Sequence, residues 1–109
     1  MKSLGLIEVE SVAAAVDALD LMCKAADVEF VTWERKLGGR LVTVIVEGQI
    51  SAVKAAVEAA ANGAIKELAA SAVIASPHLE TQRMVKLSAS RILKKLKAEE
   101  KSEKFLEEV

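Results

Sequence analysis

The stretch KLGGRLVTVIVEG, residues 36–48, decides the fold of this chain. Two adjacent glycines, Gly38 and Gly39, interrupt what would otherwise be a continuous strand, and the apolar, largely β-branched run of residues 41–46 follows. Glycine suits tight turns and places where backbones approach closely, and β-branched side chains favour strands. The stretch therefore predicts a β-hairpin with a basic residue, Arg40, beside its tip.

Shorter patterned segments on both sides of the hairpin predict a sheet with two helices. Strands are expected at residues 4–9, 30–35, 41–46 and 71–75, and helices at residues 12–26 and 51–66. The order β-α-β-β-α-β is that of an α+β, ferredoxin-like fold, in which helices cover one face of an antiparallel sheet. The other face needs a different cover, for which a neighbouring subunit is a candidate.

The first helix has a candidate N-cap, Ser11, and two contrasting faces. The face expected to point inward carries Val12, Val16, Leu19, Cys23 and Ala26, and the face expected to be solvated carries Asp17, Asp20, Lys24 and Asp27. On the inward face a free thiol would behave as a small hydrophobe. We interpret Asp17 and Asp20 as solvated helix residues rather than as an acid–base pair.

Composition excludes several classes of protein. The 109 residues make one small domain, so the core of a single copy is thin and association would add burial. The net charge of −1 argues against a general nucleic-acid binder. No run of eighteen apolar residues suggests a membrane span, the N-terminus offers no signal peptide, and one cysteine excludes an internal disulfide. These features predict a cytoplasmic protein.

The only proline, Pro77, marks a change in charge. Residues 1–78 carry 7 Lys/Arg and 10 Asp/Glu, whereas residues 79–109 carry 8 and 6. We expect the first range to be the folded domain and the second a charged helical extension. Its helix is predicted over residues 79–97, with a frayed end beyond, and an apolar stripe of Val85, Ala89, Ile92, Leu93 and Leu96.

No residue constellation predicts catalysis. His78 is the only histidine, and its place after Pro77 favours a loop or helix-entry role over a role in a triad. Gly38-Gly39 lacks the spacing and the following Lys-Ser/Thr of a phosphate-binding loop. Trp33 is expected to pack on the sheet. The sequence thus indicates a structural or binding protein, not an enzyme, with no cofactor and no metal.

Several motifs in register resemble the hexamer-forming shell proteins of bacterial microcompartments, the carboxysomes and metabolosomes. The matching segments are LGLIE at 4–8, DLMCKAADV at 20–28, KLGGRLVTVIV at 36–46, EG at 47–48 with AVKAA at 52–56, and VIASPH at 73–78. The resemblance covers about residues 3–78.

The resemblance implies a flat homohexamer that tiles edge to edge into a shell with other shell proteins, encloses enzymes and passes small metabolites. The loop implied to line the central pore comprises Lys36, Leu37, Gly38, Gly39 and Arg40. The residues implied at the hexamer edge are Lys24, Asp27, Ser76, Pro77 and His78. Many relatives have Arg in place of Ser76, so weaker tiling is expected. Six Arg40 charges about 10 Å from an anion would favour its entry by about 0.7 kcal/mol, roughly threefold.

Two other functions fit the same pattern. A ferredoxin-like regulatory domain that binds a small molecule at a subunit interface has the same order of elements. A nucleic-acid or membrane-surface adaptor would depend on the basic residues 83–97; the shell interpretation expects no specific nucleic acid and no membrane as partners.

Overall fold

The computed structural model describes residues 2–35 and 40–108. Its elements follow the predicted order and add one long helix. They are β1 (Ser3–Glu10), α1 (Val12–Ala25), β2 (Val28–Arg35), β3 (Leu41–Gly48), α2 (Ile50–Gly63), β4 (Ala70–Ile74) and α3 (Leu79–Glu108).

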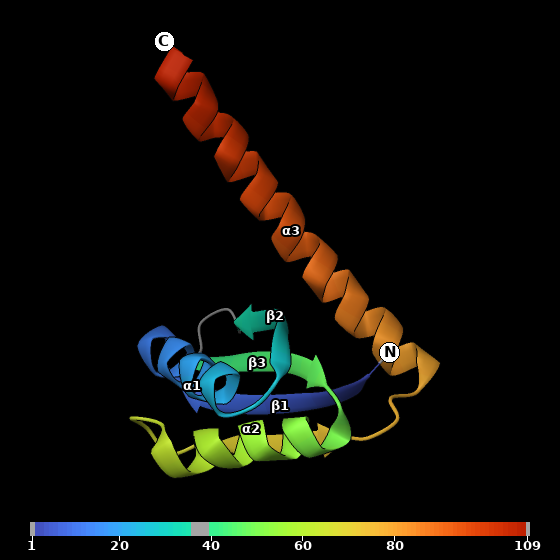
Figure 1. The fold of residues 1–109 in the computed structure, drawn as a ribbon. Coiled ribbons are helices and arrows are strands. Elements are labelled where there is room, and N and C mark those ends of the chain that lie inside the picture. Colours follow the sequence, from blue (N-terminus) through green and yellow to red (C-terminus); the bar gives the residue numbers. More distant parts are fainter. Residues whose placement is uncertain (1, 36–39, 109) are drawn as a thin grey trace.

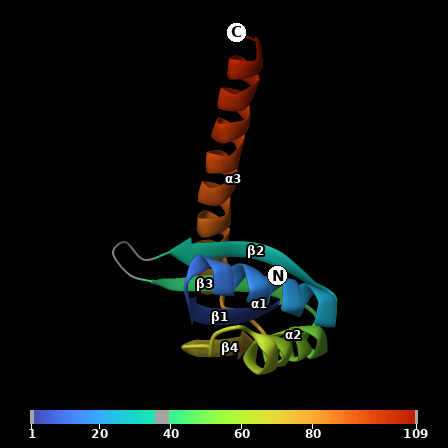
Figure 2. The same cartoon turned by 90° about the vertical axis from the view of Figure 1, so that its left-hand side faces the viewer.

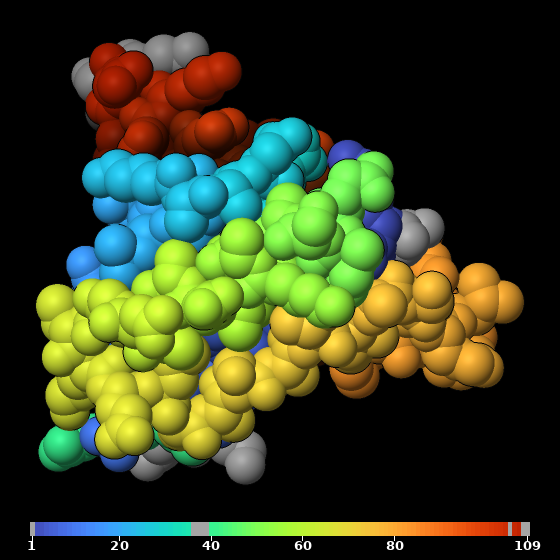
Figure 3. Space-filling model, turned by 60° about the horizontal axis from the view of Figure 1, so that its bottom comes forward, coloured from blue at the N-terminus to red at the C-terminus, as the bar shows by residue number. Residues whose placement is uncertain are grey.

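The four strands form one antiparallel sheet in the order β2-β3-β1-β4. Helices α1 and α2 lie side by side on one face of it, and α3 leaves from the other face (Figures 1 and 2). Figure 3 shows α2 alongside α1 on the helical face. The α+β, ferredoxin-like prediction is confirmed, since the element order and the covered face both agree.

The face that α1 buries differs from the predicted one. The buried residues are Ala14, Ala15, Ala18 and Met22. Val16 is 56% exposed and Cys23 is exposed, so the prediction that both point inward was wrong. Alanines allow the helix to approach the sheet closely, and this close packing outweighs the greater hydrophobicity of one valine and one cysteine.

Helix α2 packs close to β1 at Gly5. A Cβ atom on this glycine would lie 2.8 Å from Val53 Cγ1 and 3.1 Å from Val57 Cγ2. Both valines are buried in the main core, between the sheet and the two helices. Glycine at this strand position therefore sets how closely α2 can approach.

Helix α3 covers part of the second sheet face. Val85 is 2% exposed and packs with Leu4 and Ile45 in a separate small core. The hydroxyl of Ser88 lies 2.7 Å from Thr32 Oγ1 and donates a hydrogen bond to Glu34 Oε1. The chain's own helix thus supplies some of the cover that the sequence assigned to a neighbour.

The same helix runs on to Glu108, whereas a frayed end was predicted after Lys97. Residues 98–108 contain no glycine or proline, and five Glu and two Lys, which favour helix, make up most of them. Glu100 and Lys104 are also spaced at i, i+4 with the acid first, which supports the last turns.

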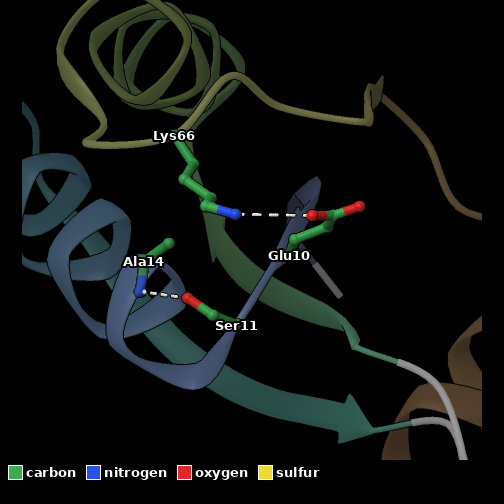
Figure 4. Close-up of polar contacts among 4 residues, drawn as sticks. All are labelled: Glu10, Ser11, Ala14 and Lys66. Carbon is green, nitrogen blue, oxygen red and sulfur yellow. Dashed lines mark hydrogen bonds and ion pairs between the residues drawn. The ribbon is translucent and has the colours of Figure 1, made fainter.

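The turn between β1 and α1 is held by Ser11 (Figure 4). Its side chain accepts a hydrogen bond of 3.1 Å from the amide of Ala14, as the N-cap prediction requires. Its own amide donates to the carbonyl of Arg40 at 2.9 Å. Nearby, Lys66 Nζ lies 3.4 Å from Glu10 Oε2. The turn is therefore joined to the base of the β2–β3 hairpin.

Candidate functional site

Of the candidate pore residues, Arg40 lies in the described part of the chain. Strand β2 ends at Arg35 and β3 begins at Leu41, and the pairing of Arg35 with Val42 brings these two strand ends to the same end of the sheet. The expected pore residues Lys36, Leu37, Gly38 and Gly39 fall outside the described residues. Arg40 is described and exposed, and the Ser11 amide fixes its carbonyl.

The candidate edge residues gather at the opposite end. Asp27 precedes β2, and Ser76, Pro77 and His78 follow β4. The strand register places β2, β3, β1 and β4 together there, through the partners Val28↔Gly48, Ser3↔Gly48 and Leu4↔Ile74. The 8 residues of β3 separate the two ends, about 26 Å at strand rise.

Lys24 lies in the last turn of α1, at this same end. Its ammonium is 2.7 Å from Asp20 Oδ2, and its side chain is 74% exposed. The hydrogen bond that Lys24 donates to Asp20, helped by the negative charge of that carboxylate, raises the pKa of Lys24. The lysine is therefore charged and accessible, but it already has a partner within its own chain.

Pro77 and His78 form the entry to α3. Pro77 is buried, and its carbonyl accepts a hydrogen bond of 3.0 Å from Gln82 Nε2. His78 Nδ1 accepts one of 3.0 Å from the amide of Glu80. The helix-entry interpretation of His78 is confirmed, while Ser76 is exposed just before it.

The two aspartates of α1 have separate structural contacts. Asp17 Oδ2 accepts from the amide of Ile65 at 3.2 Å, and Asp20 pairs with Lys24. Among residues 2–35 and 40–108 there is no group of three or more His, Cys, Asp or Glu that could hold a metal. No helix in the described part of the chain is long and apolar enough to cross a membrane.

Two exposed apolar flanks, one along each edge strand, were not predicted from the sequence. Beside β2, Phe30 is 45% and Val16 56% exposed, and a groove of about 270 Å³ continues to Trp33 and α3. On the other flank nearly all of β4 is exposed, including Val73 at 36%. The first flank was not predicted because Val16 was assigned to the core. The buried face of α1 would have to be known to recognise this flank.

Known proteins resemble this chain in sequence and in fold. The family model described as BMC domain matches residues 3–77. The bacterial microcompartment shell protein PduA of Citrobacter freundii is 42% identical over 86 residues, covering 77% of this chain and 91% of that protein. The carboxysome shell protein CsoS1C of Hydrogenovibrio crunogenus is 41% identical over 91 residues, covering 81% and 88%.

A third relative and one solved structure agree. The shell protein EutM of Salmonella typhimurium is 39% identical over 90 residues, covering 81% of this chain and 93% of that protein. A crystal structure of a microcompartment protein from Desulfitobacterium hafniense DCB superposes with a TM-score of 0.69 at 27% identity, over 81% of this chain. This chain spans 48%, about half, of that one. The chain belongs to the BMC-domain family of bacterial microcompartment shell proteins.

Proposed function

We propose that this shell protein forms a ring of six copies that surrounds a central pore and tiles edge to edge into a shell facet. The number six comes from the family resemblance. The observation that supports the ring best is that the hairpin and the candidate edge residues lie at opposite ends of one sheet. Strands that run from the centre outward would bring the hairpins together and leave Lys24 and its neighbours at the rim.

The two unlike flanks support the same geometry. The β2 flank carries Phe30 and Val16, and the β4 flank carries Val73 on an exposed edge strand. A contact between two different surfaces is heterologous, and such contacts generate a ring when the rotation between copies closes. Burial of both flanks would also add to the thin core of a single copy.

In this ring the loop 36–40 would border the pore, through which small metabolites would pass. Arg40, exposed at the base of the hairpin, would give the entrance a weak preference for anions. Other shell proteins would meet the rim, and enzymes would be enclosed by the finished shell. The role is structural, in line with the relatives, which are named as shell proteins.

The ring is tested with two variants, each of which places one negative charge on one flank. We expect six-fold discs of the parent protein by negative-stain microscopy, and no discs of Phe30→Glu or of Val73→Glu. Mixing the two variants leaves one intact flank on each, so native mass spectrometry should detect pairs with one copy of each variant, and still no discs. Both variants must keep the far-UV circular dichroism of the parent and unfold cooperatively, because loss of the ring alone is expected to lower the melting temperature.

Three outcomes would contradict the ring. They are a parent without six-fold discs, discs that survive both substitutions, and a mixture that assembles no better than either variant alone. A regulatory small-molecule-binding domain would instead show ligand-dependent melting without six-fold assembly.

Tiling gives a separate prediction at the rim. Replacing Lys24 with alanine should leave soluble rings but abolish extended sheets, because the long lysine side chain would pack along the neighbouring ring while its ammonium reaches backbone carbonyls. Light scattering and microscopy of concentrated protein measure this. Lys54→Ala, a change of another exposed lysine, on α2, is the control and should assemble as the parent does. If Lys24→Ala formed sheets as readily as the parent, the assignment of Lys24 to the edge contact would be wrong.

A further inference from the structure

The described side chains of the outer half of α3 are exposed. This holds from Leu93 to Glu107, with Leu96 at the edge of the groove beside Phe30 and Trp33, and the helix leaves the domain past β2 (Figures 1 and 2). A helical segment with so little packing is marginal in water. This half of α3 therefore offers a surface for a partner.

The charge of α3 reverses along its length. Residues 82–98 contain six basic residues and no acid, whereas residues 99–108 contain five Glu and two Lys. Laid antiparallel with Leu93 facing Leu96, two copies of α3 place residues 82–90 of each, which include Arg83 and Lys86, against residues 99–107 of the other, which include four Glu. A parallel arrangement would place like charges together, which is unfavourable.

A seam of suitable spacing runs along α3, and every described member of it is exposed except Ala89, which is half-buried. Its members are separated by three or four residues, the spacing with which paired helices pack, and they are Lys86, Ala89, Leu93, Leu96, Glu100, Glu103 and Glu107. The two leucines are 53% and 52% exposed. If Leu93 of one helix faces Leu96 of the other, the same antiparallel register sets Lys86 opposite Glu103 and Ala89 opposite Glu100.

We propose that α3 is a homotypic pairing element, which binds α3 of a second copy antiparallel through this seam. Leu93 and Leu96 form its apolar centre, and a Lys86–Glu103 contact lies on each side. The partner is thus a second copy of this chain, because its own acidic segment complements its own basic segment.

The pairing goes beyond the proposed ring and does not require it. Helix α3 lies on the sheet face opposite α1 and α2, so in a ring all six copies of α3 would project from one side. Antiparallel pairing would then join two rings face to face, and six weak contacts would act together. Without a ring, the same contact would give a dimer.

Sedimentation of the full chain and of charge-reversed variants tests the pairing. Lys86→Glu and Glu103→Lys should each weaken association by about tenfold or more, since two attractive contacts become repulsive, and should halve the mass of the particle. Mixing these two variants, or combining both changes in one chain, restores opposite charges across the seam and should restore the parent mass. Lys95→Glu, which makes the same charge change away from the seam, should sediment as the parent does.

Disulfide formation tests the direction of the helices. In a Cys23→Ser background, which removes the only cysteine, Ala89→Cys and Glu100→Cys should form a disulfide with each other when mixed, and neither with itself. Disulfides of each variant with itself would indicate a parallel bundle and overturn the proposal. A Lys86→Glu protein with the parent mass, or an equal loss in Lys95→Glu, would overturn it too. The mass of the Lys86→Glu particle tests the ring separately. Six copies would agree with the ring, and one copy would contradict the ring but not the pairing.

Discussion

Replacing Gly5 with alanine is expected to lower the free energy of unfolding by about 1–3 kcal/mol. The added methyl would lie 2.8 Å from Val53 Cγ1, and Val57 and Val46 also lie within 3.2 Å. These neighbours are buried, branched and part of the main core. Val53 and Val57 can move aside only if α2 shifts away from the sheet, and Val46 is fixed within β3.

The matched control is Gly63→Ala at the end of α2. Its added methyl would lie 3.3 Å from Leu21 Cδ1, the end of a flexible side chain. Alanine also restricts the unfolded chain more than glycine does, so stability should stay level or rise by about 0.5 kcal/mol. Urea unfolding measures both in the Phe30→Glu background, where ring formation does not add to stability. Equal stability of the two alanine variants would contradict the close approach at Gly5.

Replacing Val85 with alanine is expected to cost about 2 kcal/mol, from two buried methyl groups and the cavity that they leave. Val85 is 2% exposed and fills the small core with Leu4 and Ile45. It is also the main apolar contact that holds α3 to the sheet. Amide hydrogen exchange should therefore speed up most in the first turns of α3.

Met84→Ala is the control for this effect. Met84 is the preceding residue and is 66% exposed, so its loss should change stability by less than about 0.5 kcal/mol. Similar costs for the two variants would mean that helix propensity, rather than the docked side chain, determines the stability of α3.

Local pattern predicted the sheet well because its strands are strongly marked. The β-branched run after Gly39 sits in the centre of the sheet as β3, where both faces are covered in part. The turn chemistry at Ser11 also follows from a short polar side chain at a helix start. A strand pattern and a helix cap depend on residues that are close in sequence, so the sequence alone is enough to predict them.

What the sequence could not supply are contacts between distant segments. The hydroxyls of Ser88 and Thr32 meet across 56 positions, and a serine in a charged helix gives no sign of that. The buried face of α1 depends on how closely α2 and the sheet approach, which favours small side chains such as Ala18 over Val16. The candidate edge and pore residues came from family resemblance, and the strand register adds that Arg40 lies at the opposite end of the sheet from the edge residues.

The ion pair between Lys24 and Asp20 has a consequence for how a facet would grow. If Lys24 turned from Asp20 toward a neighbouring ring, as the proposed tiling requires, each edge contact would exchange one partner for another with a small net gain. Contacts of this kind break readily and are weakened by salt. A ring added in a wrong orientation could then detach and bind again, and a growing facet could correct its own defects.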